Sequence, residues 1–177
     1  NNEFAKLDVL EQGIKEAHER NKKFFLTVNT LPHNSKLKTF VADMEPLIAM
    51  KPDALIMADP GLIMTVREKW PEMPIHLFVQ ANTTNYWGVK FWQNIGVERI
   101  ILSRELSMEE IAEIRQECPD IELEVFIHGA LCIAYSGRCL LSGYFNHRDP
   151  NQGTCTNSCR WDYKVHNATE SDAGDAQ

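Results

Sequence analysis

Four cysteines lie close together near the carboxyl end of the chain, at Cys132, Cys139, Cys155 and Cys159. Their spacing is C-x6-C-x15-C-x3-C, and cysteine thiolates are soft ligands that bind zinc or iron–sulfur clusters. Structural zinc sites usually use short C-x2–4-C pairs at both ends, and here only Cys155 and Cys159 have that spacing. A four-iron cluster accepts thiolates from more widely separated backbone. The spacing therefore favours a 4Fe-4S cluster, with zinc as the alternative and unliganded or disulfide-bonded cysteines as a third interpretation.

The fifth cysteine, Cys118, stands apart from this group and directly precedes Pro119. An odd number of cysteines disfavours the fully paired disulfides of a secreted protein. Clustered cysteines in a cytosolic chain more often bind metal or perform redox chemistry. We expect Cys118 to be a small buried apolar side chain and not a ligand.

Basic and aromatic side chains alternate through the same cysteine-rich region, although the whole chain has a net charge of −7 and no general affinity for nucleic acid is indicated. Arginine and aromatic side chains together can hold phosphates and stack on unpaired bases. In the alternative, which composition alone favours, the aromatic rings pack around the cluster and the basic groups face solvent. The basic residues, as candidates for substrate binding, are Arg138, Arg148, Arg160 and Lys164, with Tyr144, Phe145, Trp161 and Tyr163 between them.

The rest of the chain must position these residues, and its pattern alternates short apolar strands with amphipathic helices. Continuous apolar strands are typical of parallel sheets that are covered on both faces. The predicted strands are residues 24–29, 54–58, 75–80, 99–103 and 123–128. Ser107 and Glu110 predict a capping box that opens a helix over 108–117, and Pro46 is expected to kink or end the helix over 36–50.

Repeating α/β units fit either a doubly wound sheet or a (β/α)8 barrel. No G-x-G-x-x-G motif follows a strand, which disfavours a dinucleotide-binding sheet. Five strands are too few to close a barrel. We predict an α/β fold: a partial, TIM-like (β/α) barrel of about five parallel strands over residues 1–128, then a cysteine-rich cluster-binding segment over 129–166. Residues 167–177 are acidic and are expected to be a disordered tail or part of a loop.

Polar residues directly follow the predicted strands, at the edge where α/β folds place their active sites. Capping and solvation of loops explain such residues equally well, above all in the turn sequence Asp59-Pro60-Gly61. The catalytic candidates are Arg104, Glu105 and His128, and the substrate-binding candidates are Asn29, Asp59, Gln80 and Asn82.

The stretch Glu124–Ser142, EVFIHGALCIAYSGRCLLS, matches the signature of peptidase family U32 at many fixed positions, among them Gly129, Cys132, Gly137 and Cys139. Further segments, including PDALIMADPGLIMTVRE and YFNHRDPNQGTCTNSCRW, resemble the bacterial branch of that family that hydroxylates tRNA. The resemblance covers residues 1–166, and relative to full-length members a first strand–helix unit and the region after about residue 170 are expected to be absent.

The resemblance implies a barrel-like catalytic region and a 4Fe-4S cluster on Cys132, Cys139, Cys155 and Cys159. It further implies formation of 5-hydroxyuridine at the wobble position in the tRNA anticodon loop, with prephenate as a required metabolite. Other family members are named peptidases or collagenases, so hydrolysis of peptides is the alternative activity.

Three functions therefore stay open: an iron–sulfur-dependent RNA hydroxylase, a peptidase, and a non-catalytic module that the cluster stabilises. Hydroxylation of uridine needs redox chemistry, which a cluster supports together with an electron donor protein. The motifs H-E-x-x-H and G-x-S-x-G of common hydrolases are missing from the sequence. No apolar run is long enough to span a bilayer, so we expect a cytoplasmic protein without membrane contacts.

Overall fold

The computed structural model describes residues 6–129 and 131–164 of the chain. The predicted acidic tail 167–177 and the last two residues of the predicted cysteine-rich segment lie outside these ranges. Within the described ranges, no helix has both the length and the apolar character needed to cross a membrane.

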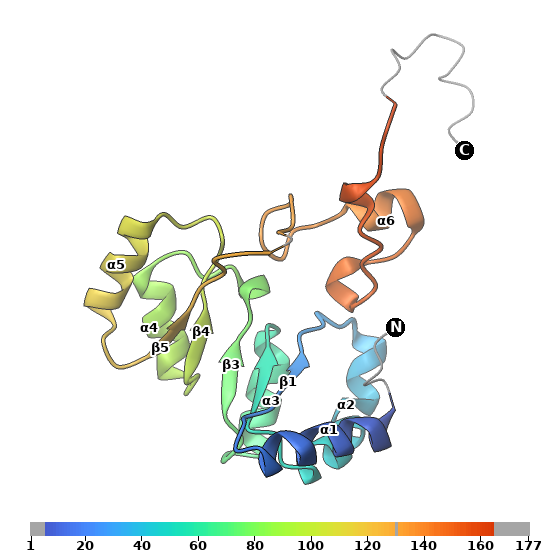
Figure 1. The fold of residues 1–177 in the computed structure, drawn as a ribbon, viewed down its shortest axis with the longest axis vertical. Coiled ribbons are helices and arrows are strands. Elements are labelled where there is room, and N and C mark those ends of the chain that lie inside the picture. The colour runs from blue at the N-terminus through green and yellow to red at the C-terminus, as the bar shows by residue number, and fades with distance from the viewer. Residues whose placement is uncertain (1–5, 130, 165–177) are drawn as a thin grey trace.

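The first part of the chain alternates helices and strands, and the second part is mostly irregular (Figure 1). The helices and strands of the first part are α1 Leu7–Glu19, β1 Phe25–Val28, α2 Asn34–Ala49, β2 Ala54–Met57, α3 Pro60–Lys69, β3 Ile75–Leu77, α4 Tyr86–Asn94, β4 Arg99–Ile101, α5 Met108–Glu117 and β5 Glu122–Glu124. The short helical turns of both parts are η2 Val79–Ala81, α6 Leu141–Asn146, η3 Pro150–Gln152 and η4 Ser158–Arg160.

The five strands form one parallel sheet in the order β1-β2-β3-β4-β5. Each strand pairs with the next one along the chain. A doubly wound sheet has a point at which the strand order reverses, and this sheet has none. Winding in one direction is the arrangement of a β/α barrel. The prediction of an α/β fold with a five-stranded partial barrel is confirmed.

The main core lies between the sheet and the helices that cover one of its faces. Because side chains alternate along a strand, Ile75 and Leu77 point to the helices and His76 points to the other face. On that other face, Arg99 bonds to both Glu122 and Glu124, and the ring of Phe25 meets the ring of His76 edge to face, while Ile56 adds an apolar side chain. Fully buried core side chains include Leu55, Met57, Ile63, Val66, Ile75, Leu77, Val89, Ile100 and Ile114.

Side-chain caps fix the places where the helices begin after the strands. The carboxylate of Asp59 accepts the Leu62 N–H at 2.9 Å at the start of α3, and Asn85 does the same for α4 through the Gly88 N–H. The capping box predicted from Ser107 and Glu110 is present at the start of α5, which confirms that prediction. Such caps stabilise a helix by about 1 kcal/mol each, and they hold the loops at the carboxyl ends of the strands in defined positions.

Several predicted bounds were wrong: the third and fourth strands, expected to reach residues 80 and 103, end at Leu77 and Ile101. The fifth strand was expected to continue to His128, but β5 ends at Glu124 and Ile127 is 93% exposed. The strand stops because β4, its only neighbour among the described strands, ends at Ile101, which pairs with Glu124. Pro46 lies inside α2, which continues to Ala49, so the helix does not end at Pro46.

Asp53 joins two elements at the amino end of the sheet and supplies a test of the fold. Its carboxylate accepts the Phe24 N–H at 2.7 Å and contacts His18 at 2.9 Å. Burial alone would raise the pKa of Asp53, but the hydrogen bonds from Phe24 and His18 outweigh it and hold the pKa below the usual value.

A lowered pKa means that the carboxylate stabilises the fold fully above its ordinary pKa of about 3.9, and that this contribution disappears as the pH falls through the folded-state value. Asp53→Asn should therefore lower the free energy of unfolding at pH 7, and the difference from wild type should shrink toward pH 2. Urea denaturation at both pH values measures this, with Asp120→Asn on the exposed turn after α5 as the control. Equal differences at the two pH values would contradict this role.

Candidate metal centre and the adjoining cavity

The four clustered cysteines converge on one small cavity of about 80 Å³. The cysteine-rich segment lies over the carboxyl ends of the strands (Figure 1), where the loops after β1, β3 and β4 meet it. The residues that line this cavity are Cys132, Ile133, Ala134, Cys139, Leu141, Ser142, Cys155, Asn157, Ser158, Cys159 and Arg160. No carboxylate or imidazole belongs to this lining, so its ligand set, in the part of the chain that is described, is one of thiols.

A buried hydroxyl network places Cys155 and Cys159 against α6. Ser142 and Ser158 are both almost completely buried. Ser142 Oγ accepts the Thr156 N–H at 3.2 Å, and Asn146 in α6 donates to Ser158 Oγ at 2.6 Å. The backbone N–H of Asn157 lies 3.4 Å from Cys155 Sγ. A donor aimed at sulfur stabilises a thiolate, which is the form of cysteine that binds metals.

A single zinc ion and a 4Fe-4S cluster require different arrangements of the four thiols. Within residues 6–129 and 131–164, no group of three or more His, Cys, Asp or Glu side chains is gathered closely enough to hold a single ion. The four thiols nevertheless line one cavity, and Cys132, Cys155 and Cys159 are exposed. Four thiols spread around a shared cavity suit a cluster that offers one iron to each of them.

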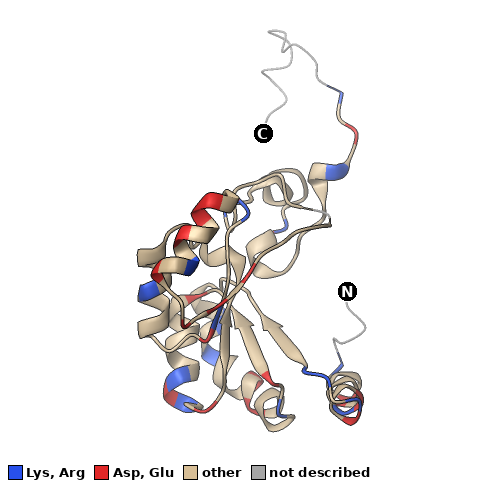
Figure 2. Cartoon of the chain, turned by 60° about the vertical axis from the view of Figure 1, so that its left-hand side comes forward, with Lys and Arg blue, Asp and Glu red and all other residues tan. Residues whose placement is uncertain are grey.

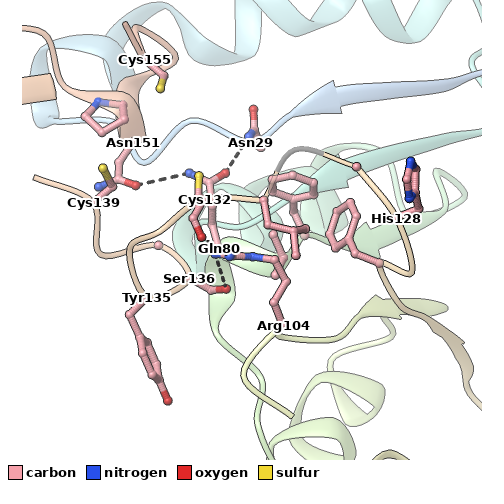
Figure 3. A pocket seen from close by; sticks show the side chains of 17 residues that line it. Asn29, Gln80, Arg104, His128, Cys132, Tyr135, Ser136, Cys139, Asn151 and Cys155 are labelled. Atoms are coloured by element: carbon pink, nitrogen blue, oxygen red, sulfur yellow. Dashed lines mark hydrogen bonds between the residues drawn. The ribbon is translucent and has the colours of Figure 1, made fainter. Parts of the chain in front are cut away.

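A second cavity of about 390 Å³ adjoins the first and shares Cys132, Cys139 and Cys155 with it. Figure 3 shows these cysteines on one side of the cavity and His128 on the other. Ligand pockets for small molecules and single bases have volumes of about 300–1,000 Å³. The remaining lining residues are Asn29, Phe78, Val79, Gln80, Arg104, Phe126, Gly129, Leu131, Tyr135, Ser136, Gly137, Pro150 and Asn151.

A chain of three side-chain amides crosses this second cavity (Figure 3). Asn29 Nδ2 donates to Gln80 Oε1 at 2.6 Å, and Gln80 Nε2 donates to Asn151 Oδ1 at 3.5 Å. The backbone carbonyl of Asn151 also accepts the Leu31 N–H at 2.8 Å. These contacts connect the ends of β1 and β3 to the segment that carries Cys155. The amides thus form a polar wall beside the thiols, with both donor and acceptor atoms.

The structure gathers some of the predicted site residues and separates others. Asn29, Gln80, Arg104 and His128 line the larger cavity, and Glu105 binds the backbone of its lining residue Ser136. Two of the substrate-binding candidates at the strand ends line neither cavity: Asp59 caps α3, and Asn82 bonds to Ser103 at 3.3 Å. Arg160 lines the smaller cavity, whereas Arg138, Arg148 and Lys164 line neither.

Asn151 and the aromatic residues Phe78 and Phe126 belong to the cavity but were not predicted. Phe78 and Phe126 lie in apolar runs that were interpreted as buried strands, so nothing marked them as site residues. Asn151 lies in a segment without helix or strand periodicity. The proximity of Asn151 to Cys155 in the sequence was the one available signal for it.

The sequence profile of peptidase family U32 matches residues 1–177. The chain belongs to peptidase family U32. Two relatives, each called tRNA hydroxylation protein P, are 66% identical in Haemophilus influenzae and 65% identical in Escherichia coli, over 98% of this chain and 38% of each relative. The chain therefore spans about two fifths of the length of these U32 proteins.

A third U32 relative is the 23S rRNA 5-hydroxycytidine C2501 synthase of Escherichia coli, which is 35% identical over 84% of this chain and 22% of the relative. Among solved structures, the U32 peptidase Mk0906 is similar with a TM-score of 0.56 and 15% identity, over 65% of this chain and 49% of that chain. At this identity the likeness concerns the fold alone, and it agrees with the partial barrel described above.

Proposed function

We propose that this chain is the cluster-binding part of an RNA hydroxylase that forms 5-hydroxyuridine at the tRNA wobble position, in the cytoplasm and with prephenate as co-substrate. The observation that carries the proposal is the junction of the two cavities: four thiols surround one space, and three of them also line a pocket large enough for a base. The names of the relatives, which specify hydroxylation of tRNA and of an rRNA cytidine, support this reading.

Cys132, Cys139, Cys155 and Cys159 would hold a 4Fe-4S cluster, for which a set of four thiol ligands is suited. Such a cluster supplies one-electron redox chemistry when bound, and an electron donor protein would exchange electrons with it. In this proposal the protein places the ligands at the rim of the barrel, next to the pocket, so that a bound base lies beside them.

The larger pocket has the features needed to hold an unpaired base. Phe78 and Phe126 offer aromatic surfaces for stacking, which contributes about 1–3 kcal/mol per base. The amides of Asn29, Gln80 and Asn151 offer donors and acceptors for the polar edge of a pyrimidine. A wobble base is already unpaired in the anticodon loop, so no base pair has to be opened.

The basic residues of the cysteine-rich segment would contact the anionic substrates. Arg138, Arg148 and Arg160 lie on this segment. Acidic residues lie on the helices that flank the sheet (Figure 2), among them Glu109 and Glu110 in the first turn of α5. Phosphate contacts of this kind orient RNA without reading its sequence. His128, which lines the pocket, would exchange a proton with a bound substrate.

A complementation experiment tests this function. The full-length protein is expressed in a bacterial strain that lacks its own tRNA uridine hydroxylases, and 5-hydroxyuridine is measured by mass spectrometry of digested tRNA. We expect the modified nucleoside to return, and to be lost again when prephenate synthesis is blocked. Cleavage of peptides by the purified protein, without any restored 5-hydroxyuridine, would contradict the proposal and favour the peptidase alternative.

A further inference from the structure

The loop from Leu131 to Cys139 carries two of the four thiols but has no helix or strand of its own. Backbone N–H and C=O groups in such a loop need partners from elsewhere in the fold. Only one backbone hydrogen bond within the described part of this loop is present, from Arg138 N–H to Tyr135 O at 2.9 Å. The position of Cys132 therefore depends on contacts with the barrel.

Arg104, in the loop after β4, supplies most of these contacts. Its Nη1 donates to the Cys132 carbonyl oxygen at 2.6 Å, and its Nη2 donates to the Ala134 carbonyl oxygen at 3.1 Å. Nη2 also lies 3.3 Å from Ser136 Oγ, as Figure 3 shows. Hydrogen bonds from a charged donor are about twice as strong as neutral ones. One guanidinium thus holds three successive points of the loop, beginning at the first thiol residue.

Glu105 binds the same loop as a hydrogen-bond acceptor. Its Oε1 accepts the Ser136 N–H at 2.8 Å, and Ser136 is 2% exposed. The guanidinium binds loop carbonyls and the adjacent carboxylate binds a loop amide. Ser103, which precedes both residues, is 3% exposed, so the pair is anchored to the buried end of β4.

We infer that Arg104 and Glu105 are positioning residues for the metal centre, which fix the Cys132 loop and set the charge beside it. The inference rests on the proposed function in so far as it concerns a cluster. It gives Arg104 a role other than recognition of a substrate carboxylate, since its guanidinium already serves the loop. A permanent positive charge at the Cys132 backbone favours the more reduced state of a cluster.

Four variants and one control test the inference in protein purified without oxygen. Arg104→Gln and Glu105→Leu remove the contacts, while Arg104→Lys keeps the charge and Glu105→Gln keeps an acceptor oxygen. Arg115→Gln is the matched control, because Arg115 also donates to two backbone carbonyls, of Cys118 and Pro119, but at the far end of α5. The measurements are hydrogen exchange at the Ser136 amide in iron-free protein, and the midpoint potential of the iron-loaded protein.

Arg104→Gln and Glu105→Leu should accelerate exchange at Ser136 by about tenfold or more, the factor lost with one charge-assisted hydrogen bond. Arg104→Gln should also make the midpoint potential more negative. Arg104→Lys, which keeps the positive charge, should have a midpoint potential close to that of wild type. Arg115→Gln should match wild type. Glu105→Gln should keep part of the protection at Ser136, because it retains an acceptor oxygen, and should make the midpoint potential less negative, because it removes a negative charge. Unchanged exchange at Ser136 and an unchanged potential in Arg104→Gln would overturn the inference and leave the proposed function intact. A wild-type protein that takes up no iron would contradict the proposed function, while the exchange data would still decide whether the loop is held as inferred.

Discussion

Replacement of Cys132 with alanine should abolish both iron binding and the formation of 5-hydroxyuridine. Cys132 lines both cavities and is held at its carbonyl by Arg104. Loss of a residue that merely supports a metal ligand typically lowers metal affinity by about 10–100-fold. Loss of the ligand itself should have a larger effect. Iron and sulfide per chain, measured after anaerobic reconstitution, and modified tRNA in complemented cells both report it.

Cys118→Ala is the control for this experiment. Cys118 is 2% exposed, lies at the end of α5 and packs in the main core, as predicted for a small apolar side chain. The variant should keep the iron content and the modification of wild type. If Cys132→Ala retained its iron, or if Cys118→Ala lost its iron to the same extent, the assignment of the ligands would be wrong.

The second large effect is expected for Gly137→Ala, which acts on the backbone and not on a ligand. Gly137 has φ +72°, a left-handed conformation that costs other residues about 1–2 kcal/mol. A Cβ at this position would overlap the carbonyl oxygen of Gln80 and lie 3.1 Å from its carbonyl carbon. Overlap in a packed site costs a further amount of about 1–3 kcal/mol. The loop must therefore move away from the end of β3.

Because Gly137 lies between Cys132 and Cys139, this movement should separate the thiols and lower the affinity for iron by at least about tenfold, the factor that corresponds to 1.4 kcal/mol. Gly153→Ala is the matched control: Gly153 has φ +82°, but its added Cβ would meet only Thr30 Cγ2 at 3.6 Å. It carries the same backbone strain without the overlap, so it should bind iron nearly as well as wild type. Equal losses in both variants would show that strain alone, and not contact with Gln80, is responsible.

The sequence allowed the barrel part to be predicted because its signals are local. Buried parallel strands are continuous apolar runs, and a capping box needs only Ser107 and Glu110. The fifth strand was overestimated because apolar residues such as Ile127 continue the pattern after the pairing with β4 has ended. Periodicity reports which residues are apolar, but the length of a strand also depends on its neighbour.

The sequence predicted some of the residues that line the cavities, but not their contacts. Arg104 and Gln80 were placed correctly at the ends of strands, where polar residues form the rim of a barrel. The sequence does not show that Arg104 binds backbone carbonyls of a loop about thirty residues later, since carbonyls have no residue signature. Nor does the sequence show that Asn151 accepts a hydrogen bond from Gln80, because this contact depends on the path of the whole cysteine-rich segment.

We propose that four thiols hold one iron–sulfur cluster at the rim of the U32 barrel. The most direct test is quantification of iron, acid-labile sulfide and zinc in protein purified without oxygen. The proposal predicts about four irons and four sulfides per chain and no stoichiometric zinc. One zinc per chain without sulfide would contradict it.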